Sequence, residues 1–228
     1  RGLGDVYKRQ PKFETKIYYN SMNISSDIFV WFKLVLNDTS EFHNIKQDGD
    51  QLNSRINKLE KIFDYYNEER PLTKKHIYQQ NRKKILFREV VRTTRQAYEV
   101  LKRMSRYQND LYQLNNQLLL QIKLELDSLV TLHEQIFKSL SKKARYDVTQ
   151  LDYEVDNPQK KNLMDAFQQE LIKNPHQTQY SYSNMMQIIA EIEEYRYQLE
   201  HLDRIRLSFF TYHLSLIHIS EPTRLRRI

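Results

Sequence analysis

The chain of 228 residues carries 36 Lys or Arg against 29 Asp or Glu, and it contains three glycines and no cysteine. Its length suits one domain of average size. The lack of cysteine excludes a disulfide framework and thiolate chemistry, and three glycines are too few for a phosphate-binding loop or a dinucleotide-binding turn. The sequence also lacks a nucleophile elbow and a pair of carboxylates spaced for acid/base work. We therefore expect no enzyme and no cofactor.

The two ends of the chain are predicted not to belong to the protein. Arg1–Gln10 and Leu214–Thr223 can be encoded by exact reverse complements of each other, which is a property of DNA and not of folding. The nucleotides match a transposase-type sequencing adapter, with Arg224–Ile228 continuing into its index. Residues 1–10 and 214–228 are thus expected to be adapter-derived and are left out of fold reasoning. Residues 11–213 are expected to be one helical domain cut from a longer protein.

Removing the ends changes the charge. Six basic and two acidic residues lie in them, which leaves 30 basic against 27 acidic residues, or +3 in place of +7. A balance this close to neutral gives little electrostatic support for a nucleic-acid partner. We expect no such partner.

The authentic segment begins with two predicted helices. A mixed run from Pro11 ends in the apolar stretch Ile24–Leu36, which is too short and too polar to span a bilayer of roughly 30 Å. We interpret this stretch as a helix docked on the core, with a helix in a membrane interface as the alternative. The next helix ends before Pro71. Its apolar residues have the 4-3-4 spacing of a coiled-coil seam: Leu52, Ile56, Leu59 and Phe63.

The stretch from Lys83 to Tyr107 is predicted to be a long central helix. Its apolar residues recur at steps of three and four and form one buried face: Phe87, Val91, Thr94, Tyr98, Leu101 and Met104. Basic residues recur at steps of three and four beside this face, with Glu99 filling the gap between Arg95 and Lys102, and form a basic stripe: Arg88, Arg92, Arg95, Lys102 and Arg106. Three interpretations of the basic stripe remain open, namely a solvated face partly neutralised by Glu89 and Glu99, a surface that attracts anions, and a contact with a second subunit.

Three further elements complete the chain. A strict heptad predicts a helix through Leu119, Ile122, Leu126, Leu129, His133, Ile136 and Leu140. The region from Ser141 to Asn157 loses this period and is predicted to be a long loop, followed after Pro158 by a short helix carrying Leu163, Phe167 and Leu171. Ser181 or Ser183 is expected to cap a last long helix, whose apolar side carries Met185, Ile188, Ile192, Tyr195, Leu199, Leu202 and Phe209. The predicted fold is therefore all-α, an antiparallel bundle of five to six long helices.

The sequence gives little support for a metal-binding site. His133-Glu134 is the first half of the zinc-protease signature H-E-x-x-H, but Phe137 stands where the second histidine should be. We expect His133 to be buried and hydrogen-bonded to a neighbour. The acidic part of the 141–157 loop lacks the glycine and the final glutamate of a calcium loop, so a solvated loop is favoured there. We expect no metal site.

Several segments resemble one family. Pro11-Lys12-Phe13-Glu14 is similar to the Pro-Pro-Lys-Tyr-Glu segment that follows the last membrane span of aromatic acid exporters of Gram-positive bacteria, the fusaric-acid-resistance-like family. Here Gln10 replaces the first proline and Phe13 the tyrosine. RTTRQAYEVLKRM (92–104) resembles the Arg-x-x-Gln-x-x-x-Leu-x-x-Met helix of the family's C-terminal domain, with one more residue in each of the first two intervals here, and IAEIEEYRYQLE (189–200) resembles its closing helices. No catalytic or substrate residue carries over.

The resemblance implies a helical domain on the cytoplasmic side of a cell-membrane exporter of aromatic acids or similar organic anions. Its expected role is regulation, assembly or coupling. Its expected partners are the exporter's own transmembrane domain, a second copy of the chain and anionic lipid head groups. The alternative is a soluble helical scaffold or coiled-coil interaction protein.

Overall fold

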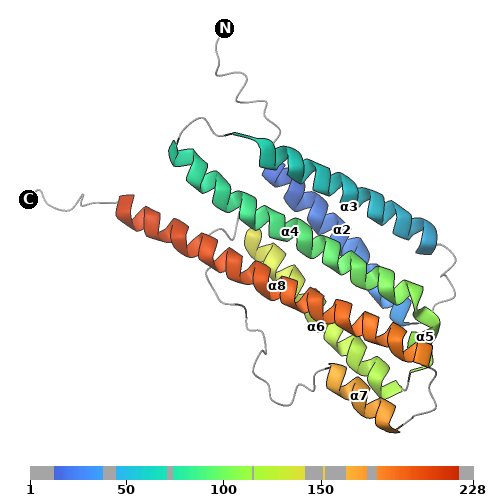
Figure 1. The fold of residues 1–228 in the computed structure, drawn as a ribbon. Coiled ribbons are helices and arrows are strands. Elements are labelled where there is room, and N and C mark those ends of the chain that lie inside the picture. Colours follow the sequence, from blue (N-terminus) through green and yellow to red (C-terminus); the bar gives the residue numbers. More distant parts are fainter. Residues whose placement is uncertain are drawn as a thin grey trace, which may run out of the picture.

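The computed structural model describes residues 13–37, 45–70, 74–114, 116–141, 151, 163–173 and 179–220. Within these ranges every regular element is a helix (Figure 1). Five helices are long and two are short, so the predicted all-α bundle is confirmed. Their bounds are α2 (Phe13–Leu36), α3 (Ile45–Glu68), α4 (Lys74–Arg106), α5 (Gln108–Tyr112), α6 (Asn116–Leu140), α7 (Leu163–Lys173) and α8 (Gln179–Ser220).

Helix α4 is the centre of the bundle, as the sequence predicts. It packs against α2, α3 and α8, while α6 packs against α8 and α2, and α7 lies against α6 and α8. The four helices α2, α3, α4 and α6 alternate in direction (Figure 1). Helix α8 runs antiparallel to α4 and in the same direction as α6.

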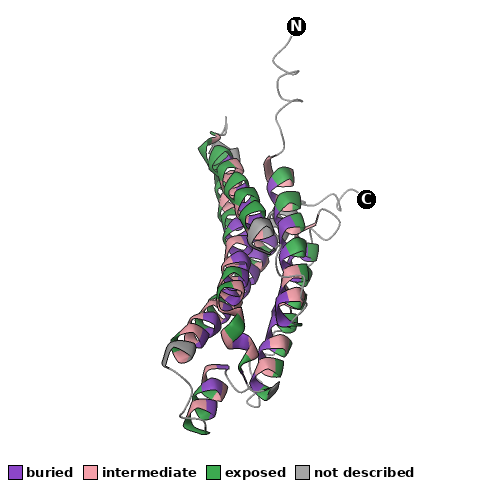
Figure 2. Ribbon diagram, turned by 90° about the vertical axis from the view of Figure 1, so that its right-hand side faces the viewer, coloured by how far each residue is buried: buried purple, intermediate pink, exposed green. Residues whose placement is uncertain are grey.

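The predicted apolar face of α4 is buried, and so is a second face. Five of its six predicted core residues are buried and Phe87 is half-buried. Leu86, Val90, Ala97 and Val100 are buried as well. A helix that packs against three long neighbours must bury more than one stripe, because each neighbour covers a different side. Figure 2 shows the buried positions as bands along the long helices, with the exposed positions outside them.

The other predicted seams also face the core. The seams of α3, α6 and α8 are buried throughout, apart from the half-buried Phe63, Leu119 and Leu140. Each partly buried residue lies near an end of its seam. Burial of an aliphatic or aromatic side chain is worth roughly 1.5–3 kcal/mol, so these shared seams hold the bundle together.

Some predicted boundaries differ from the structure. Helix α8 begins at Gln179, so Ser181 and Ser183 lie inside the helix and the predicted cap there is wrong. The predicted loop at 141–157 and Pro158 lie almost wholly outside the described residues. The backbone of α8 continues past His213 to Ser220. In the part of the chain that the structure describes, no helix combines the length and the apolar character that a membrane span requires.

Candidate functional site

Four members of the basic stripe form an exposed surface on α4. The side chains of Arg88, Arg92 and Lys102 are 51%, 63% and 56% exposed, and Arg106 is also exposed. The helix turns of α4 place this surface between the side that faces α3 and the side that faces α8. Lys102 Nζ lies 3.2 Å from Glu99 Oε2, so part of its charge is offset on the same helix.

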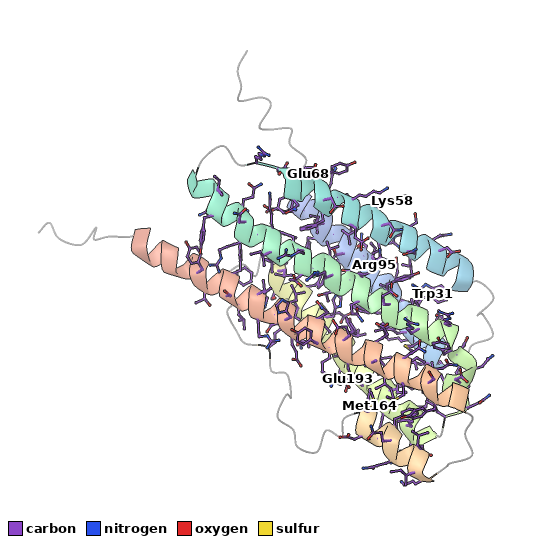
Figure 3. The ribbon with its side chains drawn as sticks, viewed as in Figure 1. Trp31, Lys58, Glu68, Arg95, Met164 and Glu193 are labelled. Carbon is purple, nitrogen blue, oxygen red and sulfur yellow. The ribbon has the colours of Figure 1, made fainter. Side chains whose placement is uncertain are left out.

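Arg95 differs from the rest of the stripe because α3 already holds it. Its Nε and Nη2 donate to the two carboxylate oxygens of Glu60 at 2.9 and 2.8 Å. It also donates to Asn53 at 2.9 Å and to Asn57 at 2.7 Å. The hydrogen bonds to Glu60 raise the pKa of Arg95. Figure 3 shows Arg95 where α4 meets α3, and its role is to join these helices.

A buried carboxylate, that of Glu89, lies beneath Arg88 and Arg92 at the N-terminal end of the basic stripe. The side chain of Glu89 is only 3% exposed, and its Oε1 lies 3.5 Å from Arg88 Nε and 3.4 Å from Arg92 Nη1. His201 of α8 approaches Oε2 to 3.9 Å. Removing a cation from around a buried carboxylate is costly. Arg88 and Arg92 therefore support the fold as well as contributing exposed charge.

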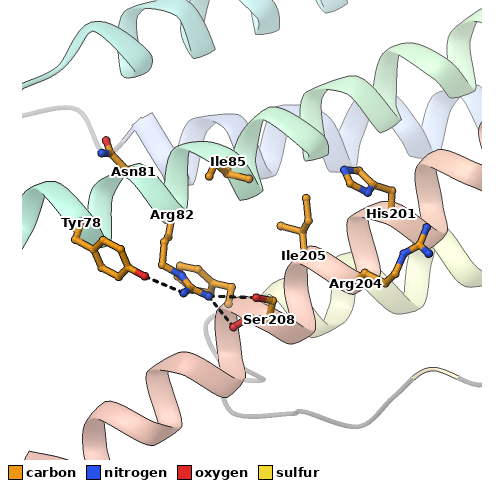
Figure 4. A pocket seen from close by; sticks show the side chains of 9 residues that line it. Tyr78, Asn81, Arg82, Ile85, His201, Arg204, Ile205 and Ser208 are labelled. Atoms are coloured by element: carbon orange, nitrogen blue, oxygen red, sulfur yellow. Dashed lines mark hydrogen bonds between the residues drawn. The ribbon is translucent and has the colours of Figure 1, made fainter.

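A groove of about 650 Å³ opens between the start of α4 and the C-terminal half of α8 (Figure 4). A volume of this size is typical of small-molecule sites. Helix α4 contributes Tyr78, Asn81, Arg82 and Ile85 to the lining, and α8 contributes His201, Arg204, Ile205, Ser208 and Phe209. None of these nine residues is acidic.

Arg82 is fixed at one end of this groove. Its Nη2 donates to the carbonyl oxygen of Ser208 at 2.8 Å and to Ser208 Oγ at 3.3 Å, and Nη1 donates to the hydroxyl of Tyr78 at 3.5 Å. The guanidinium carbon also lies 4.2 Å from the centre of the Tyr212 ring. All of these partners are uncharged, so the positive charge of Arg82 is positioned without being neutralised.

Arg204 is the second arginine of the groove. It is exposed, and it makes no ion pair or hydrogen bond with any residue in the described ranges. Figure 4 shows Ile85 and Ile205 between Arg82 on one side and His201 and Arg204 on the other. The α4–α8 groove thus has a cationic group at each end and an aliphatic surface between them.

The sequence did not indicate this groove. Arg82 and Arg204 lie outside the predicted stripe, and 122 positions separate them in the chain. Only the antiparallel pairing of α4 with α8 brings them to one groove. The available local signals were the i,i+4 pairs Tyr78–Arg82 and Arg204–Ser208, and such pairs are common on exposed helix faces.

His133 lies in the core and is hydrogen-bonded, as expected. Its Nδ1 is 2.7 Å from the hydroxyl of Tyr195 on α8, and the ring stacks on Phe137 and meets the edge of Phe29. Complete burial lowers the pKa of His133 to about 3, so the ring is neutral at physiological pH. The described residues hold no group of three or more His, Asp or Glu side chains arranged to bind a metal.

Comparison with known proteins gives one relative at useful similarity. UPF0421 protein YgaE of Bacillus subtilis (strain 168) is 32% identical over 205 residues, which cover 89% of this chain and 56% of the relative. The chain thus spans a little over half the length of the relative it matches. The relative's name states no activity, substrate or partner. No protein-family model matches the chain. No solved structure matches it.

Proposed function

We propose that the chain is the cytoplasmic helical domain of a cell-membrane exporter of aromatic acids or similar organic anions. In this proposal it regulates, assembles or couples the transmembrane part and carries out no catalytic step. The similarity of 92–104 and 189–200 to the closing domain of such exporters supports the proposal. Both stretches lie in the α4–α8 pair, which is the most extensive helix contact of the bundle.

The exposed part of the basic stripe is the observation that carries the proposal. Arg88, Arg92, Lys102 and Arg106 extend along about 27 Å of α4 at 1.5 Å per residue. A row of this length can attract organic anions or anionic head groups over a distance of about one Debye length, roughly 8 Å at physiological ionic strength. Arginine suits this role because its planar fork binds carboxylate and phosphate with two hydrogen bonds.

The partners of this surface are the exporter's own transmembrane domain, anionic head groups of the inner leaflet, or a second copy of the chain. A solvated charged face is the competing interpretation, because exposed ion pairs are worth only about 0–1 kcal/mol and are common on helices. A helical scaffold protein remains the alternative function. The complete gene separates the two functions, since an exporter requires apolar runs of about 20 residues outside this segment.

The experiment uses the complete gene in a bacterial host and measures efflux of a labelled aromatic acid at low and high salt. The test variant combines Lys102→Gln with Arg106→Gln, and it leaves Arg88 and Arg92 in place because they neutralise Glu89. The matched control combines Lys58→Gln with Lys61→Gln, which removes two exposed charges from α3.

We expect the test variant to reduce efflux at low salt and the control to leave it unchanged. The difference should shrink at high salt, because ions screen exposed charges. Binding to vesicles containing phosphatidylglycerol would identify head groups as the partner. Equal efflux of both variants at low salt, together with equal vesicle binding, would leave the solvated face as the remaining interpretation.

A further inference from the structure

We propose that the α4–α8 groove is a regulatory binding site for a small organic dianion, with two carboxylates at opposite ends of a flat apolar body. The inference deepens the proposed function and rests on it for its physiological role, because it names the class of effector that the helical domain would sense. The binding itself follows from the lining of the groove.

The charges of the groove indicate an anion. Arg82 and Arg204 have no acidic partner in the described chain, and none of the nine lining residues is acidic. On the α4 side of the groove, Glu89 contacts His201 but is already paired with Arg88 and Arg92. A carboxylate entering the groove would therefore meet two guanidinium groups that form no ion pair within the described residues. Charge-assisted hydrogen bonds between guanidinium and carboxylate are among the strong polar contacts of proteins.

The positions of the two arginines indicate a ligand with two acidic groups. Arg82 is anchored to Ser208, four residues beyond Arg204 on α8, and Figure 4 shows the two arginines on opposite sides of Ile85 and Ile205. A benzene ring with carboxylates at its 1 and 4 positions points its two acidic groups in opposite directions, so each can approach one arginine. Three of the five N–H donors of Arg82 suffice for its contacts with Ser208 and Tyr78, so two remain for a ligand.

The surface between the two ends indicates an apolar body. Ile85 is 41% exposed at this position, and Ile205, Phe209 and Tyr78 complete the lining around it. A bound ring would remove this aliphatic surface from water, at roughly 25 cal/mol for each Å² covered. A hydrated ion such as phosphate gains nothing from such a surface. The groove therefore favours a ring-bearing anion over an inorganic one.

The ligand would contact both α4 and α8, so its binding would be coupled to the contact between these two helices. Each helix supplies one arginine and one isoleucine to the groove, so binding fastens the start of α4 to the C-terminal half of α8. A ligand that binds only the folded, paired arrangement stabilises it by mass action. Occupancy of the groove would thus report the concentration of the effector as a change in the α4–α8 contact.

The test is isothermal titration of the whole 228-residue chain with terephthalate, benzoate, terephthalamide and inorganic phosphate. We expect saturable one-site binding of terephthalate, at least fivefold weaker binding of benzoate, and no binding of the neutral amide or of phosphate up to about 10 mM. Terephthalate should also raise the melting temperature of the chain. Equal affinity for terephthalate and benzoate would overturn the two-ended site, and no saturation with either would overturn the groove as a binding site.

Variants locate the site. Arg204→Gln should weaken terephthalate at least tenfold without changing the melting temperature of the free chain, because Arg204 makes no ion pair or hydrogen bond with any described residue. Ile85→Glu places a carboxylate in the groove and should abolish binding, whereas Ile85→Gln should reduce it only a few-fold. Arg106→Gln removes an equal charge from the far end of α4 and should change the affinity less than twofold. Equal effects of Arg204→Gln and Arg106→Gln would show general charge attraction and overturn the proposal.

The outcomes also separate this inference from the proposed function. Terephthalate binding to a chain whose removal leaves efflux intact would support the site and contradict the exporter role. Efflux that depends on the chain, together with no terephthalate binding, would contradict the site alone.

Discussion

On the side of α4 that faces α3, Arg95 is held by Glu60, Asn53 and Asn57, whereas on the side that faces α8, Arg82 meets only uncharged groups. Both arginines belong to one helix, and both are partly buried. The facing helix makes the difference, because α3 supplies a carboxylate and two amides while this part of α8 supplies a second arginine. The groups on the facing helix therefore decide whether an arginine joins two helices or keeps its positive charge available for a ligand.

The largest effect on stability is expected when leucines in the hydrophobic core of the bundle are truncated. Leu101 of α4 and Leu129 of α6 are 3% and 2% exposed. We expect Leu101→Ala and Leu129→Ala each to lower the free energy of unfolding by about 2–5 kcal/mol, through lost burial and the cavity left behind. Chemical denaturation measures this, with the exposed Leu120→Ala as the control. A loss below about 1 kcal/mol at either buried site would mean that the helix faces are assigned wrongly.

The next largest effect is expected at His133, a buried side chain that stays neutral in the folded protein. The unfolded chain protonates His133 below its ordinary pKa of 6.5, whereas the folded chain does so only near pH 3. The unfolded state therefore binds more protons in this window, and stability should fall as the pH decreases from 6.5 towards 3, by up to about 1.4 kcal/mol per pH unit.

Denaturation across this pH range measures the effect, and variants isolate it. Replacing both hydrogen-bond partners in a His133→Phe, Tyr195→Phe double variant should remove this contribution to the slope, since no titrating ring remains. The same slope in the parent chain and in the double variant would contradict a buried neutral His133.

A direct comparison of the two sides of α4 should give a smaller difference. Arg95→Ala removes four hydrogen bonds to α3, and we expect it to cost about 1–2 kcal/mol, a value reduced by the partial exposure of Glu60. Arg204→Ala removes no ion pair or hydrogen bond within the described residues and should change stability by less than about 0.5 kcal/mol. Urea denaturation of both variants tests the contrast. Equal costs would refute the distinction between a structural and an available arginine.

The smallest effect is expected at the two ends, which belong to neither side of α4. Deleting residues 1–10 and 214–228, which we predict to be adapter-derived, should change the free energy of unfolding by less than about 0.5 kcal/mol, because tails of that origin would not have been selected to pack on the bundle. The deletion shortens the backbone of α8, which continues to Ser220. Thermal and urea denaturation of the trimmed chain measure the change. A loss of several kcal/mol would show that the ends contribute to the fold.

Local periodicity in the sequence is enough to predict the long helices and one buried face of each. Steps of three and four residues place Val91, Tyr98 and Leu101 on one stripe, and water drives such a stripe into a core whatever the partner is. The heptad through α6 likewise placed His133 in the core, where its ring is held by Tyr195. These features depend on local periodicity, and the printed chain contains that information.

Which helices meet, and what their polar side chains face, depends on how the whole chain packs. The sequence grouped Arg95 with Arg88 and Arg92 because helix spacing is local, but α3 binds Arg95 while Glu89 lies beneath the other two. It gave no sign of the α4–α8 groove, because Arg82 and Arg204 meet there only through the antiparallel pairing of distant helices. Helical periodicity fixes which side of a helix is apolar, whereas the identity of the neighbour on each side depends on the packing of the whole chain.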